Sequence, residues 1–327
     1  MKRPWLAPLV PLYAAGTALR ARMQTARQLA WPVISVGNLS TGGAGKTPLT
    51  IALARALTAR DVHVDVLSRG YGRASSEPAR VDPEGSAAAY GDEPLLVARA
   101  AQVPVYVAPR RYGAGLLAET DYAGRQNIEP GRGMCVHLLD DGFQHRRLAR
   151  ATDVVLLRDA DLDDGLLPAG NLREPLSALE RATVVAVMAE ELRAQAYIRS
   201  SRLIWRLHRR MVIPKVDGPV AAFCGIARPE QFFAGLEQAG IVLVMRKALR
   251  DHHPYTSADI EHLLASARSV GAAAFITTEK DAVRLGSLAA QFPADLPLLT
   301  AGLTIQIEDE AAVMDWLVAR LSVRATA

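Results

Sequence analysis

A glycine-rich turn followed by Lys-Thr is the feature that most limits what this chain can fold into. A β-branched stretch leads into the turn, and the whole segment reads Val33-Ile34-Ser35-Val36-Gly37-Asn38-Leu39-Ser40-Thr41-Gly42-Gly43-Ala44-Gly45-Lys46-Thr47-Pro48. A strand, a glycine-rich turn and a helix in this order are the layout of a P-loop, in which backbone N–H groups curl around phosphate oxygens. The sequence therefore predicts an α/β domain that binds a nucleotide.

Each part of this loop has an expected role. We expect Lys46 to reach the β- and γ-phosphates and the Thr47 hydroxyl to bind Mg²⁺. A helix that begins at Pro48 would add its positive dipole end beneath the phosphates. The strict pattern has a glycine where this chain has Ser40. The alternative is a glycine-rich turn with a chance Lys-Thr, which the order of strand, loop and helix disfavours.

The composition is typical of a packed globular protein. The chain has 327 residues, of which 50% are hydrophobic, and this predicts two domains with a sizeable core. Its two cysteines, Cys135 and Cys224, lie in dissimilar contexts, which argues against a disulfide framework and fits a reducing compartment. No uninterrupted apolar run approaches the ~18 residues that a membrane-spanning helix needs.

The N-terminal segment is both basic and apolar. The first acidic residue of the chain is Asp61, and residues 1–30 combine Lys and Arg with Trp5, Tyr13 and several leucines. This combination favours an amphipathic helix over 1–30 that contacts a membrane surface. An ordinary helix docked on the protein is the second interpretation. A signal peptide is the third, and the prolines at positions 4, 8 and 11 argue against it.

Short β-branched runs alternate with helical stretches over residues 31–212. The expected strands are nearly continuous in apolar residues, as in strands covered on both faces. They are Val33–Val36, Val62–Leu67, Val103–Val107, Met134–Leu139, Val154–Leu157 and Thr183–Val187. Helices are expected over Leu49–Thr58 and Glu93–Ala101. We predict an α/β fold of the P-loop type, with a mostly parallel sheet and helices on both faces.

A smaller C-terminal α/β domain is expected over residues 213–327, after turn signals near Pro214. Its expected strands are Val220–Cys224, Ile241–Met245 and Ala273–Thr277, and its expected helices are Pro229–Ala239, Ser257–Val270 and Ala311–Leu321. The basic, alternating segment Arg202–Met211 is expected to form an exposed strand. We expect Leu303–Ile307 to pair with it, which gives a two-strand linker between the domains.

A pair of acidic residues ends an apolar strand in Val136-His137-Leu138-Leu139-Asp140-Asp141-Gly142-Phe143-Gln144-His145. P-loop enzymes hold Mg²⁺ with a carboxylate at this place, so Asp140 is the expected ligand. Asp141 would be a second carboxylate at the carboxyl end of the strand, where open α/β sheets bind ligands. An Asp-Gly turn without function is the alternative.

The turn-rich segment Leu167–Pro175 holds an adjacent Arg173 and Glu174. Arg173 would neutralise charge on a transferred phosphoryl group, and Glu174 would bind Mg²⁺. The alternative is a loop that enters a helix, where the helix dipole favours Glu174.

Asp92, in Gly91-Asp92-Glu93-Pro94, and His252, in Asp251-His252-His253-Pro254-Tyr255, are candidates for proton transfer. A carboxylate accepts the hydroxyl proton when a phosphoryl group moves to an alcohol, and a histidine orients that carboxylate. A helix N-cap and a polar loop are the alternatives. Basic segments around Tyr71 and Arg111 suit an anionic, partly sugar-like substrate, and they equally suit RNA or a solvated face. No motif favours nucleic acid.

Together these segments closely resemble the tetraacyldisaccharide 4′-kinases of lipid A biosynthesis. Six motifs occur in the order that the family has: Gly-Asn-Leu-Ser-Thr-Gly-Gly-Ala-Gly-Lys-Thr, Ser-Arg-Gly-Tyr, Gly-Asp-Glu-Pro, Leu-Asp-Asp-Gly-Phe-Gln-His, Leu-Pro-Ala-Gly-Asn-Leu-Arg-Glu-Pro and Asp-His-His. The match covers the chain from the N-terminal helix to about residue 252. The serine at position 40 is similar to the family as well.

The resemblance implies an activity and a place in the cell. Family members use ATP and Mg²⁺ to phosphorylate the 4′-hydroxyl of tetraacyldisaccharide 1-phosphate, which gives lipid IVA. They are peripheral proteins on the cytoplasmic face of the Gram-negative inner membrane, which their N-terminal helix contacts. The resemblance implies neither nucleic acid nor an obligate protein partner.

The resemblance also implies roles for single residues. The catalytic residues would be Asp92, His252, Lys46 and Asp141. The nucleotide would be held by Thr41, Gly42, Gly43, Ala44, Gly45, Lys46, Thr47 and Arg173. The metal would be held by Thr47, Asp140 and Glu174, and the substrate by Tyr71, Arg111, His145 and Asn171.

Three other functions compete with this one. A P-loop ATPase switch is the first, although such proteins carry a lysine where this chain has Thr41. A cytosolic kinase of small metabolites is the second, in which the N-terminal helix would be only structural. A nucleotide-gated binding module without transfer activity is the third.

Overall fold

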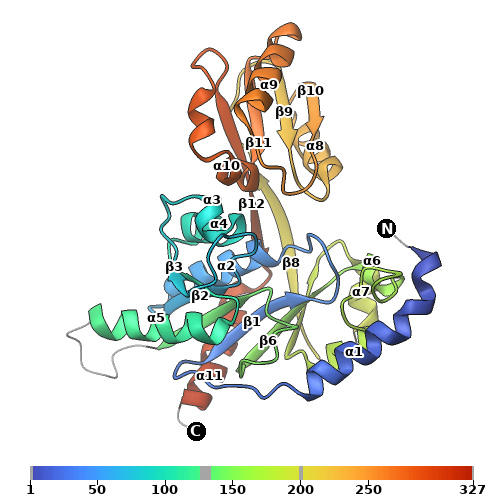
Figure 1. The fold of residues 1–327 in the computed structure, drawn as a ribbon, viewed down its shortest axis with the longest axis vertical. Coiled ribbons are helices and arrows are strands. Elements are labelled where there is room, and N and C mark those ends of the chain that lie inside the picture. The colour runs from blue at the N-terminus through green and yellow to red at the C-terminus, as the bar shows by residue number, and fades with distance from the viewer. Residues whose placement is uncertain (1–2, 126–133, 199–201, 326–327) are drawn as a thin grey trace.

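The computed structural model describes residues 3–125, 134–198 and 202–325, and within them the strands form one twelve-stranded mixed sheet (Figure 1). The strand order is β10-β9-β11-β12-β8-β7-β6-β1-β5-β2-β4-β3. The predicted α/β fold with a mostly parallel sheet is confirmed. The sheet runs without a break through two packed units, one below and one above in the figure.

The lower unit is built on parallel strands that are buried on both faces. The strand that leads into the P-loop, β1, lies between β5 and β6, and all of its residues are buried. The strands are β1 (Val33–Asn38), β2 (His63–Ser68), β4 (Val105–Val107), β5 (Cys135–Asp140), β6 (Thr152–Leu157) and β7 (Val184–Met188), with the short antiparallel β3 (Ala79–Arg80) at the edge. Side chains at the carboxyl ends of β1 and β5 are therefore close together.

The helices of this unit cover both faces of its sheet (Figure 1). They are α2 (Lys46–Thr58), α3 (Ala87–Tyr90), α4 (Asp92–Ala101), α5 (Arg111–Arg125), α6 (Asp159–Leu162), α7 (Leu192–Tyr197) and the 3₁₀ turn η2 (Leu176–Arg181). The P-loop helix begins at Lys46 and not at the predicted Pro48, because Gly45 takes the N-cap position with φ of 90°. Both Lys46 and Thr47 thus lie in the first turn, at the positive end of the helix dipole.

The upper unit repeats the alternation of strand and helix on a smaller scale. Its elements are β9 (Val220–Cys224), α8 (Pro229–Gln238), β10 (Leu243–Ala248), α9 (Ser257–Ser269), β11 (Ala274–Thr278), α10 (Glu279–Leu285) and the 3₁₀ turn η3 (Gly286–Gln291). The helix α9 begins at Ser257, as in the predicted range. Thr256, not Ser257, is the N-cap, because its hydroxyl accepts from the N–H of Asp259 while the Asp259 carboxylate accepts from the N–H of Thr256.

Two long strands join the units. The antiparallel pair β8 (Leu203–Val212) and β12 (Leu298–Ile307) connects β7 of the lower unit to β11 of the upper unit. Leu303 lies opposite Met211, so the predicted pairing of these two segments is confirmed. We call this pair the ribbon.

The last helix, α11 (Glu310–Ala325), returns to the lower unit (Figure 1). Its buried residues Met314 and Leu317 belong to the same core cluster as β1 and α2, and Trp316 packs edge to face on Trp205 of β8. The sequence-based division grouped this helix with residues 213–327. In the structure its apolar face covers the lower sheet instead, which is where the larger hydrophobic surface lies.

The N-terminal segment forms the 3₁₀ turn η1 (Pro4–Leu9) and the helix α1 (Val10–Arg22) on the outside of the lower unit. Neither element contains a buried residue. Within the described ranges, no helix has the length and hydropathy that a bilayer span requires.

We predict that Gly37→Ala destabilises the protein by about 1–3 kcal/mol, because an added methyl group overfills this packed site. A Cβ at Gly37 would lie 2.5 Å from Cβ and 2.8 Å from N of Phe143, which follows the acidic pair. Urea unfolding measures the change. The control is Gly16→Ala on α1, where a Cβ would meet nothing within 4 Å. Equal stability of the two variants would contradict the packing argument.

Candidate active site

The P-loop holds its lysine in place through a short polar chain. The Lys46 ammonium donates to Oδ1 of Asn38 at 3.1 Å and lies 3.5 Å from Oδ1 of Asp141. Gly42 and Gly45 have φ of 97° and 90°, values that glycine adopts without strain. A Cβ on Gly42 or Gly43 would meet nothing within 4 Å. The loop is therefore open on the side where a phosphate would approach its backbone N–H groups.

Ser40 has a structural reason to replace the glycine of the strict pattern. Its buried hydroxyl oxygen accepts from Nη2 of Arg158 at 2.8 Å and from Nδ2 of Asn38 at 3.3 Å. Arg158 is itself buried and pairs with Asp161 at 2.7 Å. A chain of hydrogen bonds thus runs from Arg158 through Ser40 and Asn38 to Lys46, and it fixes the lysine before any ligand binds.

The acidic pair at the end of β5 is split between two environments. Asp140 is buried and accepts from the Thr50 hydroxyl at 3.2 Å. Burial, together with the charges of Glu93 and Asp141, raises the pKa of Asp140 to about 6. Burial also acts to raise the pKa of Asp141, but the charges of Lys46 and Arg173 lower it below its ordinary value. Asp141 is therefore a stable carboxylate, while Asp140 lacks compensating positive charge.

This shortage of positive charge suits a cation. Hydroxyl and carboxylate oxygens such as those of Thr47 and Asp140 are donors that Mg²⁺ prefers, and Mg²⁺ usually keeps several waters and phosphate oxygens as its other ligands. Among the described residues, no group of three or more His, Cys, Asp or Glu side chains could hold a metal ion by itself. The chemistry of these residues is compatible with Mg²⁺ that arrives with a nucleotide.

The loop that carries Arg173 closes over the P-loop. The Arg173 guanidinium donates to both oxygens of Asp141, at 3.0 and 2.9 Å. Its backbone N–H donates to the carbonyl of Leu39, and the Thr41 N–H donates to the carbonyl of Asn171 at 2.8 Å. Backbone hydrogen bonds thus hold the segment with Asn171 and Arg173 against the P-loop.

Glu174 points elsewhere. One of its oxygens accepts from Arg146 at 2.6 Å and the other from Arg181 at 3.2 Å. In this structure the carboxylate of Glu174 is thus held by these two arginines.

Asp92 and His252 meet across the junction of the two units. The carboxylate oxygen Oδ2 of Asp92 lies 3.0 Å from Nδ1 of His252, although the residues are 160 positions apart. Asp92 is the first residue of α4, and Gly91 takes the N-cap position, so the alternative of an Asp92 N-cap is wrong. Burial acts to raise the pKa of Asp92, but Arg284, His252 and Lys280 together outweigh it, and the pKa is lowered.

Sequence reasoning missed the basic residues of α10 that reach this junction. Nε of Arg284 donates to Oδ2 of Asp92 at 2.8 Å, and Nζ of Lys280 donates to Oε1 of Glu93 at 2.8 Å. Because the charge of Glu93 acts on Asp140, the start of α4 lies beside the end of β5. A basic residue on an amphipathic helix has no local signal that tells an ion pair from a solvated face, so neither contact could be found from sequence.

The predicted substrate residues lie at the same edge of the sheet, with different exposures. Arg111 is buried, its Nε has no partner, and burial lowers its pKa to about 10. Burial and the charge of Arg111 lower the pKa of His145 to about 4, so His145 is neutral at pH 7. Tyr71 is 71% exposed. A buried cation without a full set of partners suits an anionic ligand.

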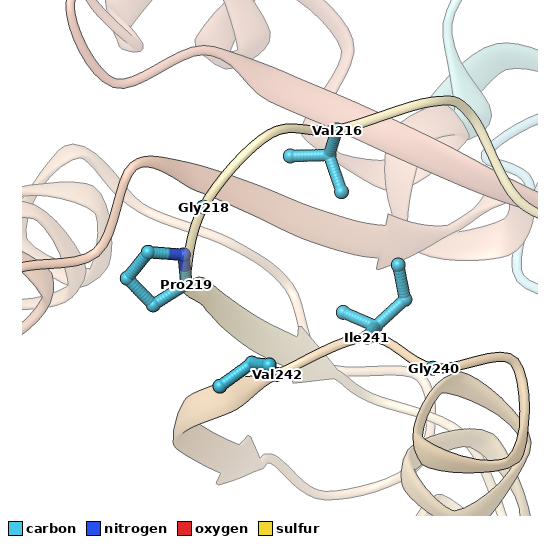
Figure 2. A pocket seen from close by; sticks show the side chains of 6 residues that line it. All are labelled: Val216, Gly218, Pro219, Gly240, Ile241 and Val242. Carbon is cyan, nitrogen blue, oxygen red and sulfur yellow. The ribbon is translucent and has the colours of Figure 1, made fainter.

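A separate hollow lies in the upper unit (Figure 2). Its volume is about 440 Å³, and it is lined by Val216, Gly218, Pro219, Gly240, Ile241 and Val242. None of these side chains carries a charge or a hydroxyl, so this hollow has no means of catalysing phosphoryl transfer.

Comparisons with known proteins identify the family. The family model for tetraacyldisaccharide-1-P 4′-kinase (LpxK) matches residues 2–322. The chain belongs to this family. A tetraacyldisaccharide 4′-kinase of Koribacter versatilis is 42% identical over 95% of this chain and 97% of its own length. That of Paramagnetospirillum magneticum is 40% identical over 98% of this chain and 95% of its own.

A solved structure agrees with this assignment. The LpxK of Aquifex aeolicus, in complex with ATP, is 30% identical, and it superimposes with a TM-score of 0.76 over 97% of this chain and 98% of its own. The six motifs of the kinase family are thus carried here on the fold of that family.

We predict that Ser40→Gly, which restores the glycine of the strict P-loop pattern, lowers the free energy of unfolding of the protein. It removes the acceptor of Arg158 and Asn38, and a lost hydrogen bond to a charged group costs about 1.5–3 kcal/mol. Urea unfolding would show this loss, and the KM for ATP would rise because Lys46 loses its support. Ser287→Gly, at an exposed position of the upper unit, is the control. A Ser40→Gly variant as stable as this control would contradict the role of the hydrogen-bond chain.

Proposed function

We propose that the chain transfers the γ-phosphoryl group of ATP to the 4′-hydroxyl of tetraacyldisaccharide 1-phosphate, a late step of lipid A biosynthesis that gives lipid IVA. Membership of the kinase family supports this reaction. The single observation that carries the mechanism is the contact of Asp92 with His252, because a buried, ionised carboxylate beside a histidine is what deprotonation of an alcohol needs.

The proposed transfer needs only ATP and the lipid hydroxyl as reactants. The 4′-oxygen forms a bond to the γ-phosphorus while the bond between that phosphorus and the β,γ-bridging oxygen breaks, and ADP leaves. The hydroxyl proton passes to Asp92. His252 orients that carboxylate and shares its proton. The lowered pKa of Asp92 keeps it ionised, and therefore able to accept a proton, throughout the neutral pH range.

The P-loop supplies the electrostatic part of catalysis. Lys46 and Arg173 both form ion pairs with the carboxylate of Asp141. Their positive charges would therefore be held in place beside the phosphate on which negative charge develops. The hydroxyl of Thr47 and the carboxylate of Asp140 would hold Mg²⁺, which neutralises charge on the β- and γ-phosphates. Glu174 would join them only after leaving its two arginines.

The remaining residues are assigned to binding. Thr41, Gly42, Gly43, Ala44 and Gly45 would offer backbone N–H groups to the phosphates. Tyr71, Arg111, His145 and Asn171 would contact the lipid substrate, and the buried guanidinium of Arg111 suits its phosphate. We propose the predicted division into residues 1–30, 31–212 and 213–327 as functional parts for membrane contact, nucleotide binding and supply of His252. The last part forms the upper unit except for α11, which packs on the lower unit.

The outward face of the N-terminal segment suits a membrane surface. Its large exposed apolar residues follow helical spacing and form one stripe: Trp5, Leu9, Leu12, Leu19 and Met23. On the inward face, the Tyr13 hydroxyl donates to the carbonyl of Arg173 at 3.1 Å. An apolar stripe among arginines fits a peripheral protein on the cytoplasmic face of the Gram-negative inner membrane, where the lipid substrate would lie.

The proposed reaction predicts that label from [γ-³²P]ATP and Mg²⁺ appears in detergent-dispersed tetraacyldisaccharide 1-phosphate. Asp92→Asn should lower kcat by about 10²–10⁴-fold, because a general base contributes that much, and leave the KM for ATP nearly unchanged. Lys46→Ala should abolish detectable transfer. Asp217→Asn, at an exposed position of the upper unit, is the control. Free phosphate without labelled lipid would instead indicate an ATPase switch.

The proposed membrane contact predicts that Leu12→Glu with Leu19→Glu weakens binding to vesicles of anionic phospholipid by about tenfold or more, since two apolar anchors are lost. Vesicle sedimentation measures the binding. Val242→Glu, which changes an equally exposed side chain in the upper unit, should bind like the unaltered protein. If the doubly substituted protein sediments as well as this control, α1 is only a docked helix.

A further inference from the structure

We infer that Arg284 is a positioning residue for the transfer step: it holds the Asp92 carboxylate against His252 across the junction of the two units. This inference rests on the proposed role of Asp92 as the proton acceptor. It assigns a function to a side chain on α10, outside the segments that carry the nucleotide site.

The guanidinium of Arg284 connects the two units through hydrogen bonds and ion pairs. Towards the lower unit, its Nε and Nη2 lie 2.8 and 2.7 Å from Oδ2 of Asp92, and Nη2 also lies 3.2 Å from Nδ1 of His252. Towards the upper unit, its Nη1 donates to the carbonyl of Gly225 at 2.6 Å and to Asp281 at 3.2 Å. The side chain is 6% exposed. Its orientation is therefore set from both sides.

The anchor in the upper unit is rigid. Asp281 is fully buried, and its carboxylate also accepts from the N–H of Gly225 at 3.0 Å, from the Tyr255 hydroxyl at 2.9 Å and from the Thr278 hydroxyl at 2.6 Å. A carboxylate with this many donors has one orientation, so it presents Arg284 to the junction at a fixed place. An ion pair whose partners are buried and fixed in this way loses little side-chain entropy when it forms.

The two carboxylate oxygens of Asp92 have different hydrogen-bond partners. Oδ2 accepts from Arg284 and lies 3.0 Å from Nδ1 of His252, whereas Oδ1 accepts from the N–H of Glu93 at 3.0 Å. A carboxylate oxygen has two acceptor sites. Oδ1 is therefore the oxygen with room for a substrate hydroxyl, and Arg284 keeps it turned away from the upper unit.

Charge at the junction favours the ionised form of Asp92. The positive groups that face it are Arg284 and Lys280 on α10 and His252 on the loop after β10, and all three act to lower its pKa against the effect of burial. The negative groups nearby are already paired: Glu93 with Lys280, Asp281 with Arg284, and Asp251 at 3.9 Å from His252. Arg284 has the largest effect among the positive groups, so its removal leaves burial dominant and raises the pKa of Asp92.

The test compares the pH dependence of kcat/KM for lipid phosphorylation in the wild type, Arg284→Gln, Arg284→Lys and Arg268→Gln. Arg268 is an exposed arginine of α9 with a partner 3.9 Å away, which makes it a matched control. We expect Arg284→Gln to lower kcat about 10²-fold through misplacement of Asp92, with the KM for ATP unchanged. The acid limb of its profile of kcat/KM against pH should move to higher pH, because the pKa of Asp92 rises. Arg284→Lys should keep the limb near its wild-type position and recover part of kcat.

The outcomes separate positioning from structure alone. Circular dichroism and ATP binding establish that each variant is folded. A folded Arg284→Gln variant with the wild-type acid limb would overturn the inference, whether or not its kcat falls, and the kinase function would stand. If the wild type itself places no label in the lipid, the proposed function fails and this inference fails with it.

Discussion

Parallel pairing of β1 with β5 and β6 at the centre of the sheet is the constraint on which the rest of the structure depends. These strands are buried on both faces, so their hydrogen bonds cannot be exchanged for water and their register is fixed. The register Val36 to Asp140 delivers the P-loop and the acidic pair to one edge of the sheet. The groups proposed to act on a phosphate are therefore side chains and backbone groups at the carboxyl ends of these strands.

The site combines charges from two units that are far apart in sequence. The lower unit supplies Lys46, Arg173 and three carboxylates, while the upper unit supplies His252 and Arg284. Most of these charges are paired before any ligand is present, which lowers the cost of burying them. Asp140 is the exception: its burial and the charges of Glu93 and Asp141 outweigh the effect of Lys46, and they raise its pKa to about 6.

The fold and half of the site could be predicted because their signals are local. Apolar strands, the glycine-rich turn and the Asp140–Asp141 pair each lie within a few neighbouring residues, and the structure places the six predicted strands of the lower unit within two residues of the prediction. Arg284 and Arg158 could not be found, because each contributes through partners more than 100 positions away. Glu174 shows the opposite case: a local motif predicted a metal ligand, and the motif does not contain the two residues, Arg146 and Arg181, with which its carboxylate pairs in this structure.

The length of the ribbon sets the distance and the orientation between the two units. In a strand, side chains alternate faces and each residue adds ~3.3 Å. One extra residue in both β8 and β12 would reverse the faces of the strand segments beyond it, and two extra residues would restore the faces but move the upper unit by ~6.6 Å. Either change would carry Arg284 out of reach of Asp92, since a hydrogen bond tolerates only tenths of an ångström. The number of residues in these two strands is thus as much a part of the active site as the residues that it contains.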